Sequence, residues 1–162
     1  MTKPLVLFLC NGNSARSQMA EAFLRHFGGD HYEALSGGLR PVGIHPLTIR
    51  VMEEKGIRLE GHHSKSLGEF FGKISPSYVF FVCQEGEVAC PKNWPFMRKT
   101  ESWPFPDPAA FEGTDQEKLD YFREVRDQIE SKVNQWLSGQ TPENVPFPNN
   151  SKDDDFRYRG VG

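Results

Sequence analysis

The sequence predicts a single α/β domain with a four-stranded parallel sheet and helices on both faces. Short, uniformly apolar runs alternate along the chain with segments whose apolar residues recur at helical spacing. Strands that are apolar throughout are buried on both sides, as in parallel sheets covered by helices. At 162 residues, the chain is long enough to bury one compact core.

The first strand, helix and second strand follow one another closely. Residues 6–10 are a continuous apolar run, and residues 32–36 are a more modest one. Between them, Gly28-Gly29 ends a helix. The apolar face of that helix is formed by Met19, Ala20, Phe23, Leu24 and Phe27.

The middle of the chain predicts two helices and the clearest strand. His45-Pro46 begins a helix, because proline suits the first helical turn, and Gly56 ends it. Residues 64–73 carry apolar side chains at the spacing of a short helix. Residues 78–83 (YVFFVC) form a third strand that ends, like the first, on a cysteine.

The last part of the domain contains a fourth strand and a long helix. We expect the strand at residues 101–103, before the turn-rich stretch PFPDPAAF. Thr114 and Glu117 form a capping box at the start of the helix, which continues to Gly139. We therefore place the domain at residues 1–139. Residues 140–162 are rich in Pro, Asn and Asp, and we expect them to form a mobile tail.

Composition narrows the functional classes. The net charge of −3 gives no general attraction to nucleic acid or to anionic membranes. No apolar stretch approaches the roughly 20 residues of a membrane-spanning helix, and the first residues lack a secretory cleavage region. Three cysteines are too few for a disulfide scaffold. We expect a monomeric cytoplasmic protein whose cysteines act as thiols.

The stretch CNGNSARS, residues 10–17, follows the first strand and leads into the first helix. A loop that turns into a helix directs backbone N–H groups at one point and can hold a tetrahedral oxyanion. Arg16 offers a planar fork of donors to two anion oxygens. The same donors favour the thiolate form of Cys10. The residues expected to bind the oxyanion are Asn11, Gly12, Asn13, Ser14, Ala15, Arg16 and Ser17.

A different interpretation of this stretch needs no catalysis. A strand can end in a turn that happens to contain a buried, inert cysteine, since cysteine often serves as a small apolar residue. The strand before the loop, the helix after it, and the Gly, Asn and Ser residues between favour the anion site.

CNGNSARS resembles the active-site loop of the low-molecular-weight protein tyrosine phosphatase superfamily. The segments SQMAEAFL, LSGG, GIRLEGHHSKSL, WPFPDPA and GTDQEKLDYFREVRDQI are more similar to its thioredoxin-coupled arsenate reductase branch. The likeness covers about residues 4–137. It implies that Cys10 is the nucleophile, that Arg16 clamps the oxyanion, and that Asp107 is the general acid.

The other two cysteines distinguish a reductase from a phosphatase. A phosphatase needs only the nucleophile, the arginine and an acid, and water then hydrolyses the cysteinyl phosphate. An arsenate reductase must move two electrons, and a relay of thiols supplies them. Cys83 and Cys90 match the positions of that relay in the arsenate reductase branch, which favours reduction. The alternatives are a phosphatase, in which these two cysteines have no catalytic role, and a non-catalytic oxyanion or thiol sensor.

The resemblance also implies partners. Arsenate is the expected substrate, with phosphate or sulfate as competing anions. Thioredoxin is the expected reductant, although glutaredoxin attacks an exposed disulfide by the same chemistry. We expect no tightly bound cofactor. Zinc is disfavoured, because the cysteines and His62-His63 show neither a C-x2-C pair nor the usual histidine spacing.

One residue departs from the family pattern. Some arsenate reductases of this branch bind a potassium ion beside the active-site loop, and its side-chain ligands match Asn13, Glu21 and Ser36. An aspartate in the same site falls on Lys65 here. An ammonium at this position repels potassium. We expect Lys65 to support the loop in place of the ion; the alternative is that it points into solvent.

Overall fold

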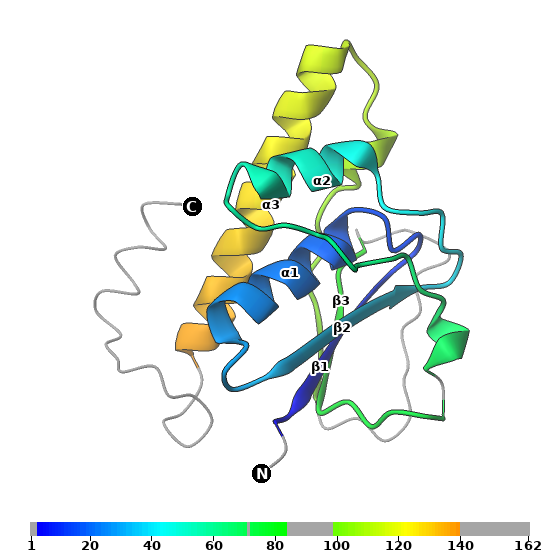
Figure 1. Cartoon of the computed structure of the whole chain (residues 1–162), viewed down its shortest axis with the longest axis vertical. Helices are drawn as coiled ribbons and strands as arrows, with labels where there is room; N and C mark the ends of the chain where they lie inside the picture. The colour runs from blue at the N-terminus through cyan, green and yellow to red at the C-terminus, as the bar shows by residue number, and fades with distance from the viewer. Residues whose placement is uncertain (1–2, 71, 84–98, 140–162) are drawn as a thin grey trace.

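The computed structural model describes residues 3–70, 72–83 and 99–139. These ranges contain four strands, three α-helices and two short 3-10 turns (Figure 1). No helix within them is both long enough and apolar enough to cross a membrane. Cys90 and the tail at residues 140–162 lie outside the described residues.

The four strands form one parallel sheet at the centre of the molecule. β1 (Leu5–Cys10) lies between β2 (Glu33–Gly38) and β3 (Tyr78–Phe81), and β4 (Lys99–Ser102) extends the sheet beyond β3. All three pairings are parallel. The predicted single domain with a four-stranded parallel sheet is confirmed. Because the strands are parallel, the carboxyl ends of β1, β2 and β3 meet at one edge, where ligands bind in such folds.

The three described α-helices lie on one face of the sheet, and the 3-10 turn Leu67–Glu69 lies on the other (Figure 1). α1 (Arg16–Gly28) and α3 (Asp115–Ser138) lie on the face of Phe8 and Phe80, and α2 (Pro46–Glu53) packs beside them (Figure 1). The predicted capping box at Thr114 and Glu117 begins α3. On the opposite face, a side chain at Gly37 would meet the ring of Phe70.

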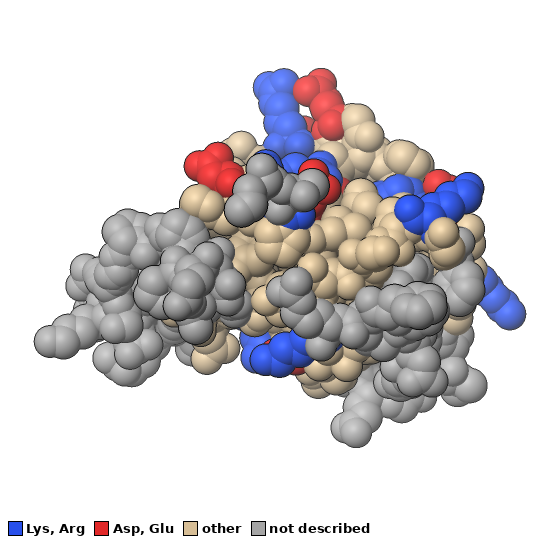
Figure 2. Space-filling model, turned by 90° about the horizontal axis from the view of Figure 1, so that it is seen from below, with Lys and Arg blue, Asp and Glu red and all other residues tan. Residues whose placement is uncertain are grey.

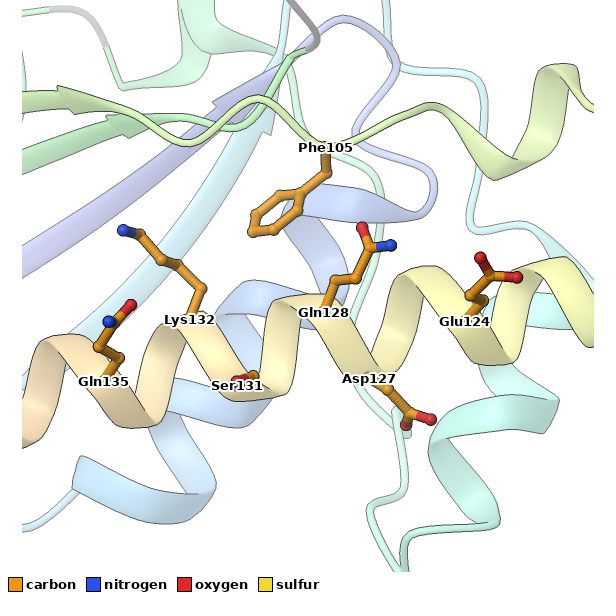
Figure 3. A pocket seen from close by; sticks show the side chains of 7 residues that line it. All are labelled: Phe105, Glu124, Asp127, Gln128, Ser131, Lys132 and Gln135. Carbon is orange, nitrogen blue, oxygen red and sulfur yellow. The ribbon is translucent and has the colours of Figure 1, made fainter. Parts of the chain in front are cut away.

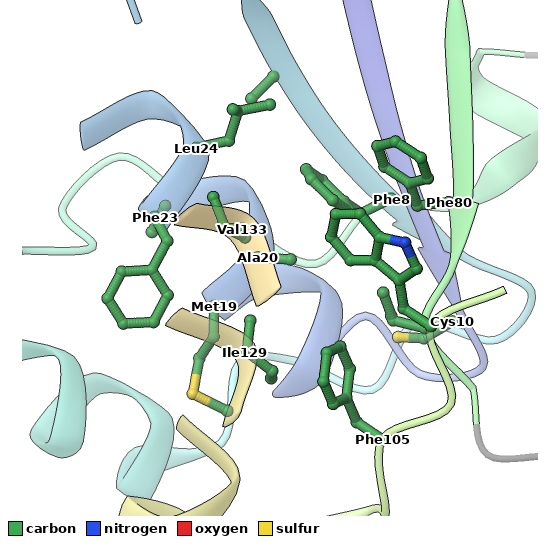
Figure 4. Packing of buried hydrophobic residues seen from close by; sticks show 14 of the residues in the cluster. Phe8, Cys10, Met19, Ala20, Phe23, Leu24, Phe80, Phe105, Ile129 and Val133 are labelled. Carbon is green, nitrogen blue, oxygen red and sulfur yellow. The ribbon is translucent and has the colours of Figure 1, made fainter. Parts of the chain in front are cut away.

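The core fills the space between the sheet and α1 and α3 (Figure 4). Phe8 and Phe80, on neighbouring strands, contact the ring of Trp103, which is only 2 % exposed. Met19 of α1 and Ile129 of α3 are fully buried in the same cluster. Full burial of one such side chain contributes about 1.5–3 kcal/mol. This packing fixes β1 and α1, and therefore the loop between them.

The predicted helix at residues 64–73 is wrong in extent. The described chain there forms only a 3-10 turn, Leu67–Glu69, capped by Ser66. Gly72 has φ +81°, a left-handed conformation that is incompatible with a continuing helix. The third strand ends at Phe81, so Cys83 lies two residues beyond it. The fourth strand begins two residues earlier than predicted and ends before Trp103.

Charged residues are dispersed on the face drawn in Figure 2. The described Lys, Arg, Asp and Glu side chains there lie in small mixed groups around a largely uncharged middle. Between the end of α2 and α3, Glu54 accepts hydrogen bonds from Arg123 and Arg126. These bonds, chiefly the one from Arg123, lower the pKa of Glu54 to about 2.

Candidate active site

Cys10 is the last residue of β1, and its sulfur is held by the loop that follows. The residue is 2 % exposed and is a free cysteine. The backbone N–H of Asn13 donates a hydrogen bond to its sulfur at 3.2 Å. The Ser17 hydroxyl lies 2.8 Å from the same sulfur. Because that hydroxyl already accepts a hydrogen bond from the Asn13 amide, its own proton is available to the sulfur.

Asn13 gives the loop its shape. Its φ of 49° makes it the one non-glycine residue with positive φ in the described ranges. The side-chain amide compensates for this conformation. It donates to the hydroxyls of Ser17 and Ser36 at 2.8 and 2.9 Å. It accepts from the Gln18 amide at 2.9 Å and from the backbone N–H of Lys65 at 2.7 Å. Four hydrogen bonds therefore hold the residue at the centre of the loop.

A buried carboxylate lies behind Asn13. Glu21 accepts a 2.5 Å hydrogen bond from Ser36 and a 2.7 Å hydrogen bond from Arg25. The Lys65 ammonium is 3.6 Å from the carboxylate oxygen that accepts from Ser36, and it donates to the carbonyl of His63 at 3.0 Å. Lys65 is only 7 % exposed, so it does not point into solvent. The expected supporting residues thus form one connected cluster.

Neighbouring segments brace the loop from outside. The Ser64 hydroxyl donates to the carbonyl of Asn13 at 2.6 Å. The Thr48 hydroxyl at the start of α2 donates to the carbonyl of Ser14 at 3.0 Å. Gly38 approaches so closely that an added Cβ would lie 2.6 Å from the Asn11 carbonyl oxygen. No side chain fits at that position, which explains a glycine at the end of β2.

Arg16 begins α1 and connects the loop to the segment after β4. Its guanidinium donates to the carbonyl of Phe105 at 3.0 Å and lies 3.6 Å from the carboxylate of Asp107. The Arg16 side chain is 4 % exposed and that of Asp107 is 39 % exposed. Asp107 also caps the 3-10 turn Pro108–Ala110 by accepting from Ala109 N–H at 3.0 Å. The carboxylate therefore has a fixed position at an open edge of the site.

These groups surround a cavity of about 260 Å³ at the carboxyl end of β1. Two residues of the predicted oxyanion-binding set, Asn13 and Ser17, do not line it but lie beneath the loop. Asn11 Oδ1 is buried without a hydrogen-bond partner in the described part of the chain. The lining consists of Cys10, Asn11, Gly12, Ser14, Ala15, Arg16, Arg40, Val42, Asp107 and Ala109.

Cys83 lies beside the site rather than in the cavity lining. It is 1 % exposed, and its sulfur is 4.0 Å from the carbonyl oxygen of Leu9, the residue before Cys10. Cys83 is disulfide-bonded, whereas Cys10 is free. Cys83, two residues beyond β3, therefore lies near the end of β1, where Cys10 is. Cys90 lies outside the described residues.

Two histidines near the site are kept neutral by their surroundings. His45 caps α2 by accepting from Leu47 N–H on Nδ1 at 3.0 Å, and partial burial lowers its pKa. Burial also lowers the pKa of His62, although the nearby Glu21 carboxylate opposes this shift. Within residues 3–70, 72–83 and 99–139, no three His, Cys, Asp or Glu side chains are grouped as a metal site requires.

A second cavity, of about 510 Å³, lies along α3. Figure 3 shows the ring of Phe105 directed toward the helix, with Gln128 rising beside the ring and Lys132 turned away from it. The Lys132 ammonium lies 5.6 Å from the centre of the Trp103 ring. The described residues that line it include no cysteine, serine–histidine pair or other activated nucleophile. The smaller cavity, which contains Cys10, is therefore the candidate active site.

Sequence reasoning missed several residues of the site. Gln18 is fully buried and contacts both Asn13 and the carbonyl of His63. Gln18 directly follows the loop in sequence, but the helical pattern predicts it only as part of the helix. Arg40 and the Phe105 carbonyl gave no signal, because only the folded chain brings them to the loop.

Comparison with known proteins identifies the relatives of this chain. The family described as low molecular weight phosphotyrosine protein phosphatase matches residues 5–145. An arsenate reductase of Shouchella clausii is 37 % identical over 133 residues, which cover 82 % of this chain and 94 % of the relative. A solved structure of an arsenate reductase in the phosphate binding state has a TM-score of 0.68 at 32 % identity, covering 82 % of this chain and 95 % of that one.

The name of a more distant relative of known structure specifies a reductant. The thioredoxin-dependent arsenate reductase of Corynebacterium glutamicum has a TM-score of 0.54 at 26 % identity. The similar region covers 83 % of this chain and 63 % of that protein.

Proposed function

The chain belongs to the low molecular weight phosphotyrosine protein phosphatase family, and we propose that it is an arsenate reductase with Cys10 as nucleophile. One observation carries the proposal. The cavity that holds Cys10, whose sulfur has two hydrogen-bond donors within 3.2 Å, also contains a buried arginine and a partly exposed carboxylate. A tetrahedral oxyanion requires this combination of nucleophile, cation and proton donor.

The first step is attack of the Cys10 thiolate on the arsenic of arsenate. Arg16 binds two oxygens of the anion with its guanidinium fork. Asp107 supplies a proton to the departing oxygen, which leaves as water. The distance of 3.6 Å between the Arg16 and Asp107 side chains supports this assignment, because an anion held by the arginine lies within reach of the acid.

Reduction follows through the other two cysteines. The Cys83 thiolate attacks the Cys10 sulfur, and arsenic leaves with the electron pair of the sulfur–arsenic bond as arsenite. Cys90 then attacks Cys83 and releases Cys10 as a thiolate. Two thiols have lost two electrons and arsenate has gained two, so the steps balance. The position of Cys83 beside the end of β1 supports the first transfer.

An external dithiol restores the enzyme by reducing the Cys83–Cys90 disulfide. We propose thioredoxin as this donor, with the thioredoxin-dependent neighbour as support. The cytoplasm would supply such a donor. Cys83 is disulfide-bonded while Cys10 is free.

We further propose that Lys65 positions the loop. Its ammonium contacts Glu21, and Glu21 holds Ser36, which in turn accepts from the Asn13 amide. The chain of contacts ends at the residue with strained φ on which the Cys10 sulfur depends. The buried Lys65 ammonium offsets the charge of Glu21, as a bound cation would.

Phosphomonoester hydrolysis is the second candidate function. It requires Cys10, Arg16 and Asp107 but neither of the other cysteines, and the family match favours it. The two functions share the first covalent step, so a single chain can have both activities.

A coupled assay tests the proposal. Purified protein is mixed with arsenate, thioredoxin, thioredoxin reductase and NADPH, and NADPH loss is followed beside hydrolysis of p-nitrophenyl phosphate. We expect arsenate-dependent NADPH oxidation that the Cys83→Ser variant lacks, while that variant keeps some phosphatase activity. Robust hydrolysis without arsenate-dependent oxidation in the unaltered chain would instead establish the phosphatase.

A further inference from the structure

Arg40 is a second arginine in the lining of the Cys10 cavity. It lies just beyond β2, on the segment that forms one wall of the cavity. Its backbone N–H donates to the Asn11 carbonyl at 2.9 Å, and Val42 N–H donates to the Gly12 carbonyl at 3.1 Å. These two bonds join the wall to the anion loop and fix the backbone of Arg40 beside it.

None of the described residues neutralises the charge of Arg40. Its guanidinium makes no ion pair or hydrogen bond with any residue in the part of the chain that the structure describes, and the residue is exposed. Arg16, by contrast, lies 3.6 Å from the Asp107 carboxylate. In the unliganded cavity the Asp107 carboxylate offsets the charge of Arg16, so among the described lining residues Arg40 supplies the net positive charge before any charge on Cys10 is counted.

That balance matters for an anion with two negative charges. A dianion that enters a lining with no net positive charge gains hydrogen bonds but little long-range attraction. An unpaired guanidinium on the wall attracts each negative charge of the anion separately. A dianion therefore gains about twice as much binding free energy from Arg40 as a monoanion of the same shape.

We propose that Arg40 is a specificity-determining residue that selects doubly charged tetrahedral oxyanions over singly charged ones. The inference rests on the proposed use of this cavity for an oxyanion, but it concerns binding alone. In this proposal the loop and Arg16 recognise the tetrahedral shape of the anion, and Arg40 recognises its charge. It also predicts a salt dependence, since attraction across an open cavity mouth is screened by ions.

Sulfate and perchlorate test the proposal, because both are tetrahedral but they carry two charges and one charge, respectively. Their binding is measured by titration calorimetry at low ionic strength on the unaltered chain and on R40Q. A unit charge about 4 Å away in water changes affinity roughly fivefold. Because Arg40 lies on the wall, we expect about threefold weaker perchlorate binding and about tenfold weaker sulfate binding in R40Q.

Arg50 provides a matched control. It is also exposed and without an ion pair among the described residues, but it lies on α2 outside the cavity lining. We expect R50Q to bind both anions like the unaltered chain, and R40K to retain most of the preference for sulfate. The R40Q effect on sulfate should also shrink as sodium chloride is added.

Three results would overturn the proposal: equal weakening of the two anions in R40Q, an effect of the same size in R50Q, or no measurable sulfate binding by the unaltered chain. Arsenate reduction is not part of this measurement. An Arg40-dependent preference for sulfate in a chain inactive on arsenate would support the role of Arg40 while the proposed function failed.

Discussion

Removing the Lys65 ammonium should loosen the active-site loop through Glu21. In Lys65→Met, the buried carboxylate keeps Arg25 and Ser36 but loses the cation 3.6 Å away. Breaking one partner of a buried ion pair costs about 3–5 kcal/mol. Because Arg25 remains bonded at 2.7 Å, we expect a smaller loss of about 2 kcal/mol in the free energy of unfolding.

This loss of unfolding free energy corresponds to a decrease in melting temperature. For a chain of this size, each kcal/mol corresponds to about 2–4 °C. Lys65→Met should therefore melt about 4–8 °C lower than the unaltered chain in differential scanning calorimetry. Activity should fall further than stability explains at 25 °C, where both proteins are folded, because the contacts from Glu21 through Ser36 to the Asn13 amide lose their cation.

Lys55→Met is the matched control. Its ammonium is closer to a carboxylate, 3.0 Å from Glu130, but the Lys55 side chain is 36 % exposed and the pair joins α2 to α3 away from the loop. Exposed pairs contribute about 0–1 kcal/mol. We expect a small loss of melting temperature and unchanged activity.

Potassium distinguishes the role of the lysine from simple packing. The unaltered chain should have the same melting temperature in potassium chloride and sodium chloride at equal ionic strength. Lys65→Asp places a second carboxylate beside Glu21, so it should be destabilised in sodium and partly restored by potassium. A wild-type chain stabilised by potassium over sodium, or a Lys65→Met variant that melts with the wild type, would refute the reasoning.

Three further predictions concern other parts of the chain. Ser17→Ala removes a donor 2.8 Å from the Cys10 sulfur, so alkylation of Cys10 by iodoacetamide at neutral pH should slow several-fold without loss of fold, as mass spectrometry can follow. Glu54→Gln should lower the melting temperature by no more than about 3 °C at pH 7, since the Glu54 and Arg123 side chains are 32 % and 35 % exposed and water screens their charges. The pKa of Glu54 is lowered to about 2, so its contribution is present above about pH 4.5 and disappears as the pH falls toward 2; the variant and the unaltered chain should then melt together. Truncation after Gly139 should leave arsenate-dependent NADPH oxidation in the coupled assay within about twofold of the full chain. A large loss in that assay would mean that residues 140–162 contribute to the domain.

Local patterns predicted the elements that depend on neighbouring residues. The capping box at Thr114 and the apolar run of β1 are local signals, and both elements form as expected. The helix at residues 64–73 failed because its polar residues contact the loop instead of extending a helix. Lys65 N–H donates to Asn13, 52 positions earlier in the chain.

In the site, too, local sequence predicted some features, and others depend on contacts between distant residues. The stretch at residues 10–17 predicted a nucleophile and an arginine, because the loop and the helix start adjoin in sequence. The strained φ of Asn13, the bond from Arg16 to the Phe105 carbonyl and the place of Arg40 on the wall depend on tertiary contacts. No single sequence contains those contacts as a pattern.

A single turnover of the Cys90→Ser variant tests the central claim most directly. The reduced variant is mixed with excess arsenate and no reductant, arsenite is quantified, and disulfides are mapped by mass spectrometry of peptides. We expect about one arsenite per protein and a disulfide between Cys10 and Cys83. Absence of arsenite in this variant, or a Cys10–Cys90 disulfide in the unaltered chain after turnover, would contradict it.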